Sequence, residues 1–188
     1  QFHYHWAARQ CLELLPSGAA DLVAVTVEGP SACETEGEEI EAGEQLIDVG
    51  LYYGSERRDE ARLVRYIQLK HSTRHAQDAW TASGMEKTIK GFAERYAKLL
   101  EYYPVDAVAQ RFRFEFTTNR PISSKVKEAL ADLASGAAPQ HPTLHETLVH
   151  HTGLDGVRAV QFFSLFTAEG GEAGLWTQRN LLTQDLSA

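Results

Sequence analysis

The pattern of apolar and polar positions predicts one helix followed by three strands in the first part of the chain. Apolar residues recur every three or four positions over residues 4–15, the repeat of one helix face, and Pro16 ends the pattern. Three strands are predicted next, over residues 22–28, 46–53 and 63–70. In the first two, apolar residues occupy every second position, as they do when one face of a strand is buried.

A long amphipathic helix is the clearest pattern in the chain. Ser83 and, three residues later, Glu86 form a capping box, which is a helix-start signal. Pro104 ends the pattern. Between these signals an apolar residue recurs every three or four positions, at Met85, Ile89, Phe92, Tyr96, Leu99 and Tyr103. We therefore predict a helix over residues 83–103 with one buried face.

Four further elements are predicted after this helix. They are a strand over residues 111–117, a helix over 124–133, a short helix over 143–153 that opens with a second capping box, and a strand over 157–166. A helix between two strands of one sheet implies a parallel crossover, whereas short turns between the first three strands imply an antiparallel meander. The chain is therefore predicted to have an α/β fold, a mixed sheet flanked by helices on both faces.

Length and composition indicate one globular domain over residues 1–188. Since the first residue is Gln1 rather than Met, we expect the chain to be the N-terminal segment of a longer protein. No run approaches the roughly 20 apolar residues of a membrane span, and no signal peptide is visible. The two cysteines, Cys11 and Cys33, make no disulfide framework. These features predict a cytoplasmic protein without a membrane partner.

The charge of the chain is unevenly distributed. Its formal net charge is −8, which argues against a protein that coats nucleic acid, because such proteins are normally basic. Six glutamates fall within residues 31–45, a stretch without Lys or Arg. This stretch is either a solvated loop or a flap that repels DNA until the protein assembles with a partner.

Four polar residues at strand ends are predicted to form an active site. Gln68 and Lys70 are two positions apart on one strand and therefore project from the same face. Asp48 lies on the preceding strand, and Glu28 ends the first strand. Carboxylate and amide oxygens are ligands for Mg²⁺ or Mn²⁺, which polarises a phosphate and lowers the pKa of bound water. A lysine beside the ion can orient that water or stabilise developing charge. The set therefore predicts phosphodiester hydrolysis.

These segments also resemble a known family. Residues 25–28 (VTVE), 46–49 (LIDV) and 66–71 (YIQLKH) resemble the E…D…QxK variant of the PD-(D/E)XK nuclease fold. More narrowly, they resemble the endonuclease domain that heads bacterial antiphage effectors, which include cyclic-oligonucleotide-gated effectors and nuclease-headed STAND NTPases. The resemblance covers roughly residues 2–135 and extends to the segment 114–121 (FEFTTNRP) and to three aromatic residues, Tyr4, Trp6 and Trp80.

The resemblance implies a role for each residue of the set. Asp48 would be the main metal ligand, and Gln68 would replace the usual glutamate. Lys70 would be the catalytic lysine, and Glu28 a second acidic group. The long Glu-rich insertion between Glu28 and Asp48 departs from the family pattern and puts the role of Glu28 in question.

The resemblance further implies a restriction-endonuclease-like sheet and an activity. The expected activity is cleavage of double-stranded DNA with Mg²⁺ or Mn²⁺ and with little sequence preference. The family also implies control by a sensor, oligomerisation or NTPase module elsewhere on the same longer chain. Because the chain is acidic, we expect weak DNA binding by a monomer and activation as a homo-oligomer.

Other polar residues have two interpretations each. His71, Arg74 and His75 follow the strand that carries Lys70 and are either phosphate contacts or an ordinary polar loop. Glu13 could reach the site but is expected at the surface. A zinc site is not expected from the four histidines of the C-terminal half, because no cysteine is near and a proline interrupts them; they are His141, His145, His150 and His151.

Two rival functions remain from the sequence. The first is a catalytically inactive module that binds nucleic acid, because Gln68 stands where a carboxylate is usual. The second is an interaction or oligomerisation domain whose sheet edge carries these residues without using them. Metal binding that depends on Asp48 would separate the first rival from the nuclease, and a long separation between Asp48 and Lys70 would favour the second.

Overall fold

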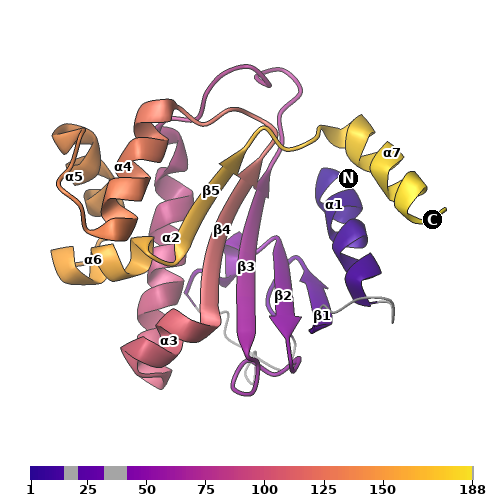
Figure 1. Cartoon of the computed structure of the whole chain (residues 1–188), viewed down its shortest axis with the longest axis horizontal. Coiled ribbons are helices and arrows are strands. Elements are labelled where there is room, and N and C mark those ends of the chain that lie inside the picture. The colour runs from indigo at the N-terminus through magenta and orange to yellow at the C-terminus, as the bar shows by residue number, and fades with distance from the viewer. Residues whose placement is uncertain (15–20, 32–41, 188) are drawn as a thin grey trace.

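The computed structural model of the protein describes residues 1–14, 21–31 and 42–187. At its centre is a five-stranded sheet with the order β1-β2-β3-β4-β5 (Figure 1). β1, β2 and β3 are antiparallel neighbours, whereas β3, β4 and β5 run parallel. The predicted α/β fold with a mixed sheet is therefore confirmed. The strands are β1 (Leu22–Val27), β2 (Val49–Tyr53), β3 (Leu63–Lys70), β4 (Phe112–Thr118) and β5 (Phe166–Gly170).

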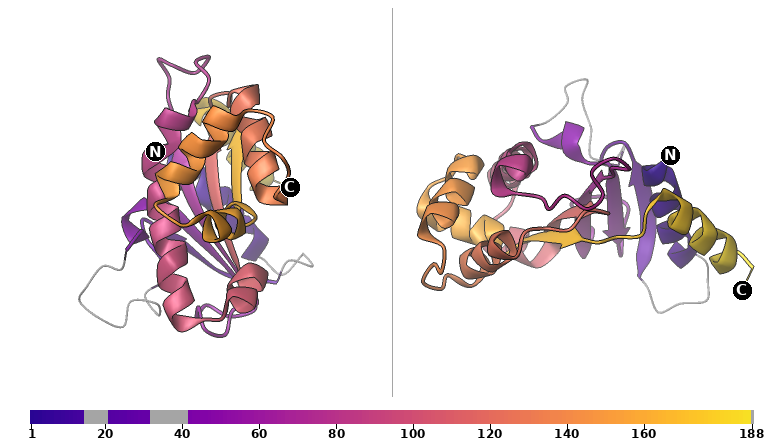
Figure 2. Two further views of the ribbon diagram at one scale, coloured as in Figure 1. Left: turned by 90° about the vertical axis from the view of Figure 1, so that its left-hand side faces the viewer. Right: turned by 90° about the horizontal axis from the view of Figure 1, so that it is seen from above.

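Helices cover both faces of this sheet (Figures 1 and 2). α1 and α7 lie on one face, and α2 lies on the other face with α4, α5 and α6 outside it or beside it. Among the described residues, no helix has the length and apolar character of a membrane span. The helices are α1 (Phe2–Cys11), α2 (Ala82–Tyr102), α3 (Val105–Arg111), α4 (Ser124–Ser135), α5 (Pro142–Thr152), α6 (Gly156–Phe163) and α7 (Leu175–Asp185).

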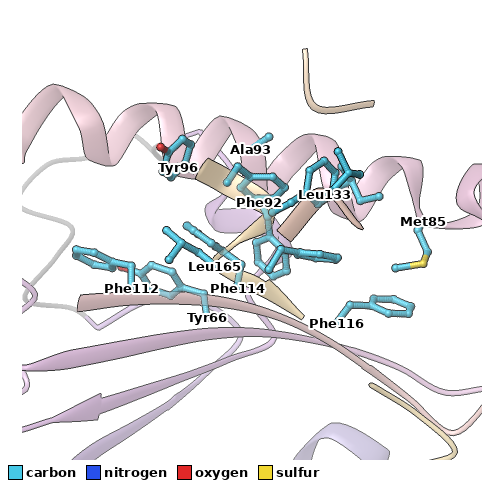
Figure 3. Packing of buried hydrophobic residues seen from close by; sticks show 14 of the residues in the cluster. Tyr66, Met85, Phe92, Ala93, Tyr96, Phe112, Phe114, Phe116, Leu133 and Leu165 are labelled. Carbon is cyan, nitrogen blue, oxygen red and sulfur yellow. The ribbon is translucent and has the colours of Figure 1, made fainter. Parts of the chain in front are cut away.

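The sheet separates two hydrophobic clusters. The larger cluster fills the space between the sheet and α2, where Phe114 of β4 packs on Phe92 and Phe162 at ring-centroid distances of 5.5 and 5.7 Å (Figure 3). The smaller cluster lies under α1 and includes Trp6 and Ile67. Because both faces are buried, neighbouring residues along β3 enter different clusters, and burial alone does not show which face a residue occupies.

The structure differs most from the prediction at the last predicted strand. Residues 157–166 were predicted to be a strand, but Gly156–Phe163 form α6, and β5 begins at Phe166. Asp155 caps the helix, since its side chain accepts a hydrogen bond from the amide of Arg158 at 2.9 Å. An apolar run of this length fits a buried helix as well as a buried strand, so the pattern alone could not decide. The helices α3 and α7 were not predicted either.

Three element starts also differ from the prediction. α2 begins after Thr81, whose hydroxyl accepts a hydrogen bond from the Gly84 amide at 3.3 Å, so Ser83 is not the cap. α5 begins with Pro142, which suits a first helical position because it needs no amide donor. β2 begins at Val49 rather than at residue 46, because Glu44–Leu46 form a 3₁₀ turn, η2.

Candidate active site

Asp48 is attached to β3 by two hydrogen bonds. It lies one residue before β2, and its backbone amide donates to the carbonyl of Ile67 at 2.9 Å. Its carboxylate oxygen Oδ2 accepts a hydrogen bond from the backbone amide of Leu69 at 2.7 Å. Leu69 stands between Gln68 and Lys70, so the fold places the Asp48 carboxylate at the segment that carries both. The side chain of Asp48 is 23% exposed and remains accessible to a small ion.

His3 of α1 is a further neighbour of Asp48 that the sequence analysis missed. Its Nδ1 lies 3.6 Å from Oδ1 of Asp48, so the two oxygens of the carboxylate have different neighbours. His71 lies close by and stacks on Phe2 of α1 with a ring-centroid distance of 4.6 Å. Burial, and then the nearby charge of His3, lower the pKa of His71, which favours its neutral form. No local pattern links His3 to Asp48, because 45 residues separate them.

Gln68 is packed against α2. Its side chain is buried on the α2 face, and its Oε1 accepts a short hydrogen bond from the hydroxyl of Thr88. Asp48, by contrast, has His3 of α1 as its side-chain neighbour, and α1 covers the opposite face. The structure thus places Asp48 and Gln68 on adjacent backbone segments, while their side chains contact different helices. A carbonyl oxygen has a second lone pair, so the contact with Thr88 leaves acceptor capacity on Gln68.

Lys70 is the last residue of β3, where it pairs with Thr118 of β4. It is half-buried, and its side chain forms no hydrogen bond or ion pair with another residue in the described ranges. Within residues 1–14, 21–31 and 42–187, no carboxylate pairs with the ammonium group of Lys70. Lys70 can therefore reach toward a negatively charged ligand at the end of the sheet.

Glu28 is held near Asp48 by its backbone but not by its side chain. Its amide donates to the carbonyl of Asp48 at 2.8 Å. Its side chain is exposed and accepts a hydrogen bond from the Tyr4 hydroxyl at 2.5 Å. That bond raises the pKa of Tyr4, because losing the phenolic proton beside a carboxylate is unfavourable. Glu28 has a positive φ of 61°, which turns the chain away from β1.

The loop after β3 is fastened to the loop after β4. Asn119 forms two hydrogen bonds with Ser72: its Oδ1 accepts from the Ser72 amide at 3.0 Å, and its Nδ2 donates to the Ser72 carbonyl at 2.8 Å. Arg120 stacks over the ring of Trp80 at 4.5 Å from the ring centroid. Through these contacts the FTTNRP segment holds the loop that follows Lys70 and carries Arg74.

The three candidate phosphate contacts differ in exposure and in whether the side chain already has a partner. Arg74 is exposed on this loop. His75 is also exposed, but its Nδ1 lies 2.8 Å from Oδ2 of Asp78. The Nε2 atom of His71 accepts a hydrogen bond from the amide of Leu175 at the start of α7, at 3.3 Å. Of the three predicted contacts, Arg74 is therefore the one best placed to meet a phosphate.

The donor set limits the kind of metal site that can form. Within the described ranges, no group of three or more His, Cys, Asp or Glu side chains is arranged to hold a metal ion. Nε2 of His141 lies 2.7 Å from Oε2 of Glu128. Mg²⁺ is commonly held by one or two carboxylates together with water and substrate phosphates. Asp48 therefore fits an ion that it shares with a phosphate, rather than a closed site made by protein alone.

Two predicted features fall elsewhere. Glu13 is exposed on the 3₁₀ turn η1 (Leu12–Leu14), in agreement with the surface position expected for it. Most of the Glu-rich stretch, with Cys33, lies outside the described residues, which resume at Ala42.

No family model and no curated protein matches the chain.

Proposed function

We propose that this chain is a metal-dependent endonuclease domain of the PD-(D/E)XK type, with Asp48 and Lys70 at its centre. The observation that carries the proposal is the hydrogen bond of 2.7 Å between the Asp48 carboxylate and the Leu69 amide. It fixes a carboxylate at the end of β3, one residue from a lysine without a partner in the described ranges. The antiparallel meander followed by a parallel crossover through α2 also agrees with the fold that the resemblance implies.

The residues of this site suit hydrolysis of a phosphodiester. A divalent ion, Mg²⁺ or Mn²⁺, supplies polarisation of the scissile phosphate when it is bound. Asp48 would hold that ion through Oδ1, because Oδ2 already accepts a hydrogen bond from the Leu69 amide. Lys70 orients the attacking water and stabilises the negative charge that develops on the phosphate. Arg74, on the fastened loop, contacts a neighbouring phosphate of the same strand.

We propose double-stranded DNA as the substrate and little sequence specificity. Contacts to the phosphate backbone carry no sequence information, and the site offers such contacts from Lys70 and Arg74. With a net charge of −8 the monomer binds DNA weakly, so activity requires a homo-oligomer whose copies share one duplex. By the resemblance, this is the effector domain of a cytoplasmic antiphage protein, controlled by a sensor or NTPase module on the same longer chain.

The test is plasmid nicking with Mn²⁺ by the parent and by the Lys70→Ala variant. Lys70→Ala should lower the nicking rate by at least about 100-fold, the usual scale of a lost proton-transfer or charge-stabilising group. Its free energy of unfolding should stay within about 0.5 kcal/mol of the parent. Lys90→Ala, which removes an exposed lysine of α2, is the matched control and should nick like the parent. A Lys70→Ala protein that cuts DNA at the parent rate would show that the site is wrongly assigned.

One observation favours a second candidate function, a nucleic-acid-binding module without catalysis. Gln68 is 2% exposed and hydrogen-bonded to Thr88, so it offers a metal less than an exposed carboxylate would. Titration calorimetry with Mn²⁺ separates the two functions. A nuclease should release heat on binding Mn²⁺ that the Asp48→Ala variant lacks, whereas an inactive module should show no difference between the two proteins.

A further inference from the structure

A stripe of small and polar residues crosses the buried face of α2. Thr88, Gly91 and Arg95 stand three and four positions apart, which aligns them on one side of the helix. All three are buried, although most of their buried neighbours on α2 are apolar. Buried polar groups in a core are costly unless they are bound, so their contacts show what the stripe does.

The first contact of the stripe is a close approach at Gly91. A Cβ atom at this position would lie 1.7 Å from Cδ1 of Leu46, so the Leu46 side chain would have to move. Gly43 approaches the same place from the other side, since a Cβ atom on it would lie 2.3 Å from the Gly91 carbonyl oxygen. Gly43 also has a φ of 79°, a conformation that favours glycine. The turn η2 therefore rests directly on the backbone of α2.

The second contact is a buried ion pair. Nη1 of Arg95 lies 3.4 Å from Oε1 of Glu44, the first residue of η2, and the side chains are 0% and 4% exposed. The guanidinium group also lies over the ring of Tyr66 in β3, 5.3 Å from the ring centroid. Removing one partner of such a pair would leave a buried charge without its partner, which is costly, so the pair links η2 to α2.

The stripe reaches both segments of the candidate active site. η2 ends at Leu46, two residues before Asp48, and the intervening Ile47 is buried in the core under α2. The position of η2 on α2 therefore sets the position of the Asp48 backbone. At the other end of the stripe, the Thr88 hydroxyl binds the side chain of Gln68. One face of one helix thus holds the segments of Asp48 and Gln68 against each other.

We propose that Thr88, Gly91 and Arg95 are positioning residues for the metal site at Asp48. They touch neither the ion nor the substrate, and they act by holding η2 and β3 in the relative register that brings the Asp48 carboxylate to the Leu69 amide. This inference rests on the proposed function for its metal, but the hydrogen bond that it explains does not depend on any metal.

Two variants of the full chain test the stripe. Gly91→Ala displaces Leu46, and Thr88→Val removes only the hydroxyl that binds Gln68 while keeping the shape of the side chain. Thr152→Val is the matched control, because Thr152 is as buried as Thr88 and its hydroxyl is hydrogen-bonded to the backbone of Val149 and Leu154 rather than to Gln68. Thr88→Ser keeps the hydroxyl and should behave like the parent.

Two measurements are made on each protein. Hydrogen–deuterium exchange of the Leu69 amide, without metal, reports the hydrogen bond to Asp48, and calorimetric titration with Mn²⁺ reports the metal site. Gly91→Ala should speed exchange of the Leu69 amide at least about tenfold, and both variants should weaken Mn²⁺ binding by about 10- to 100-fold, as other outer-shell changes do. Thr152→Val should change neither measurement, even if it lowers the melting temperature as much as Thr88→Val does.

The results separate a failed inference from a failed function. If the parent binds Mn²⁺ and Thr88→Val binds it equally well, the positioning role is wrong, whatever happens to Gly91→Ala. If the parent releases no heat with Mn²⁺, the proposed function fails, and the exchange of the Leu69 amide then decides the positioning role alone. In that case, an unchanged hydrogen-exchange rate of the Leu69 amide in a folded Gly91→Ala protein overturns the positioning role. If Gly91→Ala does not fold, Arg95→Met replaces it in the exchange measurement with the same expected result.

Discussion

The side chain of Asp48 continues the pairing of β2 and β3 beyond the last backbone pair. That pair joins Val49 to Ile67, and the Asp48 carboxylate then accepts a hydrogen bond from the Leu69 amide at 2.7 Å. A carboxylate that accepts from a backbone amide forms a stronger bond than a neutral acceptor does. One residue therefore serves both the register of the sheet and the candidate chemistry.

This double role predicts different results for two substitutions of Asp48. Asp48→Asn keeps an oxygen acceptor for the Leu69 amide, whereas Asp48→Ala leaves that amide without its partner. We expect Asp48→Ala to lower the free energy of unfolding by about 1–3 kcal/mol and Asp48→Asn to lower it by less. Both should lose Mn²⁺ binding and plasmid nicking, because neither supplies an anionic ligand. Urea unfolding and Mn²⁺ calorimetry check this, and an Asp48→Asn protein with the parent's affinity for Mn²⁺ would contradict it.

An ion pair on the sheet predicts a change in stability without a change at the site. Arg65 of β3 binds Glu115 of β4 through two hydrogen bonds, of 2.6 and 2.7 Å. In the parallel register Arg65 pairs with Arg113, so its side chain reaches Glu115 two positions further along β4. Hydrogen bonding to Glu115 raises the pKa of Arg65. Glu115→Gln should lower the free energy of unfolding by about 1–3 kcal/mol, because a charge-assisted, two-pronged contact becomes a neutral one.

The hydrogen bonds that hold Asp48 to β3 are made with Ile67 and Leu69, not with Arg65 or Glu115. Mn²⁺ binding by the Glu115→Gln protein should therefore equal that of the parent, which calorimetry can measure alongside urea unfolding. A loss of metal binding without a loss of stability would instead place Glu115 in the site.

Asp132 predicts a dependence of stability on pH. Its carboxylate at the end of α4 accepts hydrogen bonds from the backbone amide of Gln140 at 2.8 Å and from the Gln140 side chain at 3.2 Å. These bonds, the backbone one first, lower the pKa of Asp132. A carboxyl group with a lowered folded pKa stabilises the fold above its ordinary pKa of about 4, and this contribution is lost as the pH falls through the folded value.

The Asp132→Asn variant tests this linkage. At pH 7 it should melt at a lower temperature than the parent, and the gap should narrow as the pH falls from about 5 to about 3, where the parent's carboxylate is protonated as well. Calorimetric melting over this pH range measures the gap. A gap that stays constant with pH would mean that the charge of Asp132 contributes nothing to stability.

The local pattern of apolar residues was sufficient to predict that the strands β1 to β4 exist. Alternating apolar residues predicted β1 and β4 to within about a residue, and the long apolar repeat predicted α2, because strand and helix periods are properties of a short stretch of chain. The start of β2 was predicted too early, since residues 44–46 leave the strand to dock on Gly91. That docking depends on a helix almost 50 residues away, which no local period can reveal.

The region after residue 153 shows where pattern fails. The apolar run over residues 157–166 fits a helix as well as a strand. Most of it forms α6, because Asp155 caps the helix and because Phe162 and Phe163 pack in the core between α2 and β5. α7 carries a weak repeat, and it is held to α1 by polar contacts of Arg9 with Gln178 and Asp185. Contacts of this kind leave no periodic signal in the sequence.

The sequence alone determined which residues could carry chemistry, their order along the chain and their places at strand ends, because these follow from residue type and period. Only the tertiary structure decided where each side chain points. It turned Gln68 toward Thr88 of α2, and it brought His3 of α1 to Asp48. Those directions depend on packing between segments distant along the chain, where burial and hydrogen bonding select one partner from many.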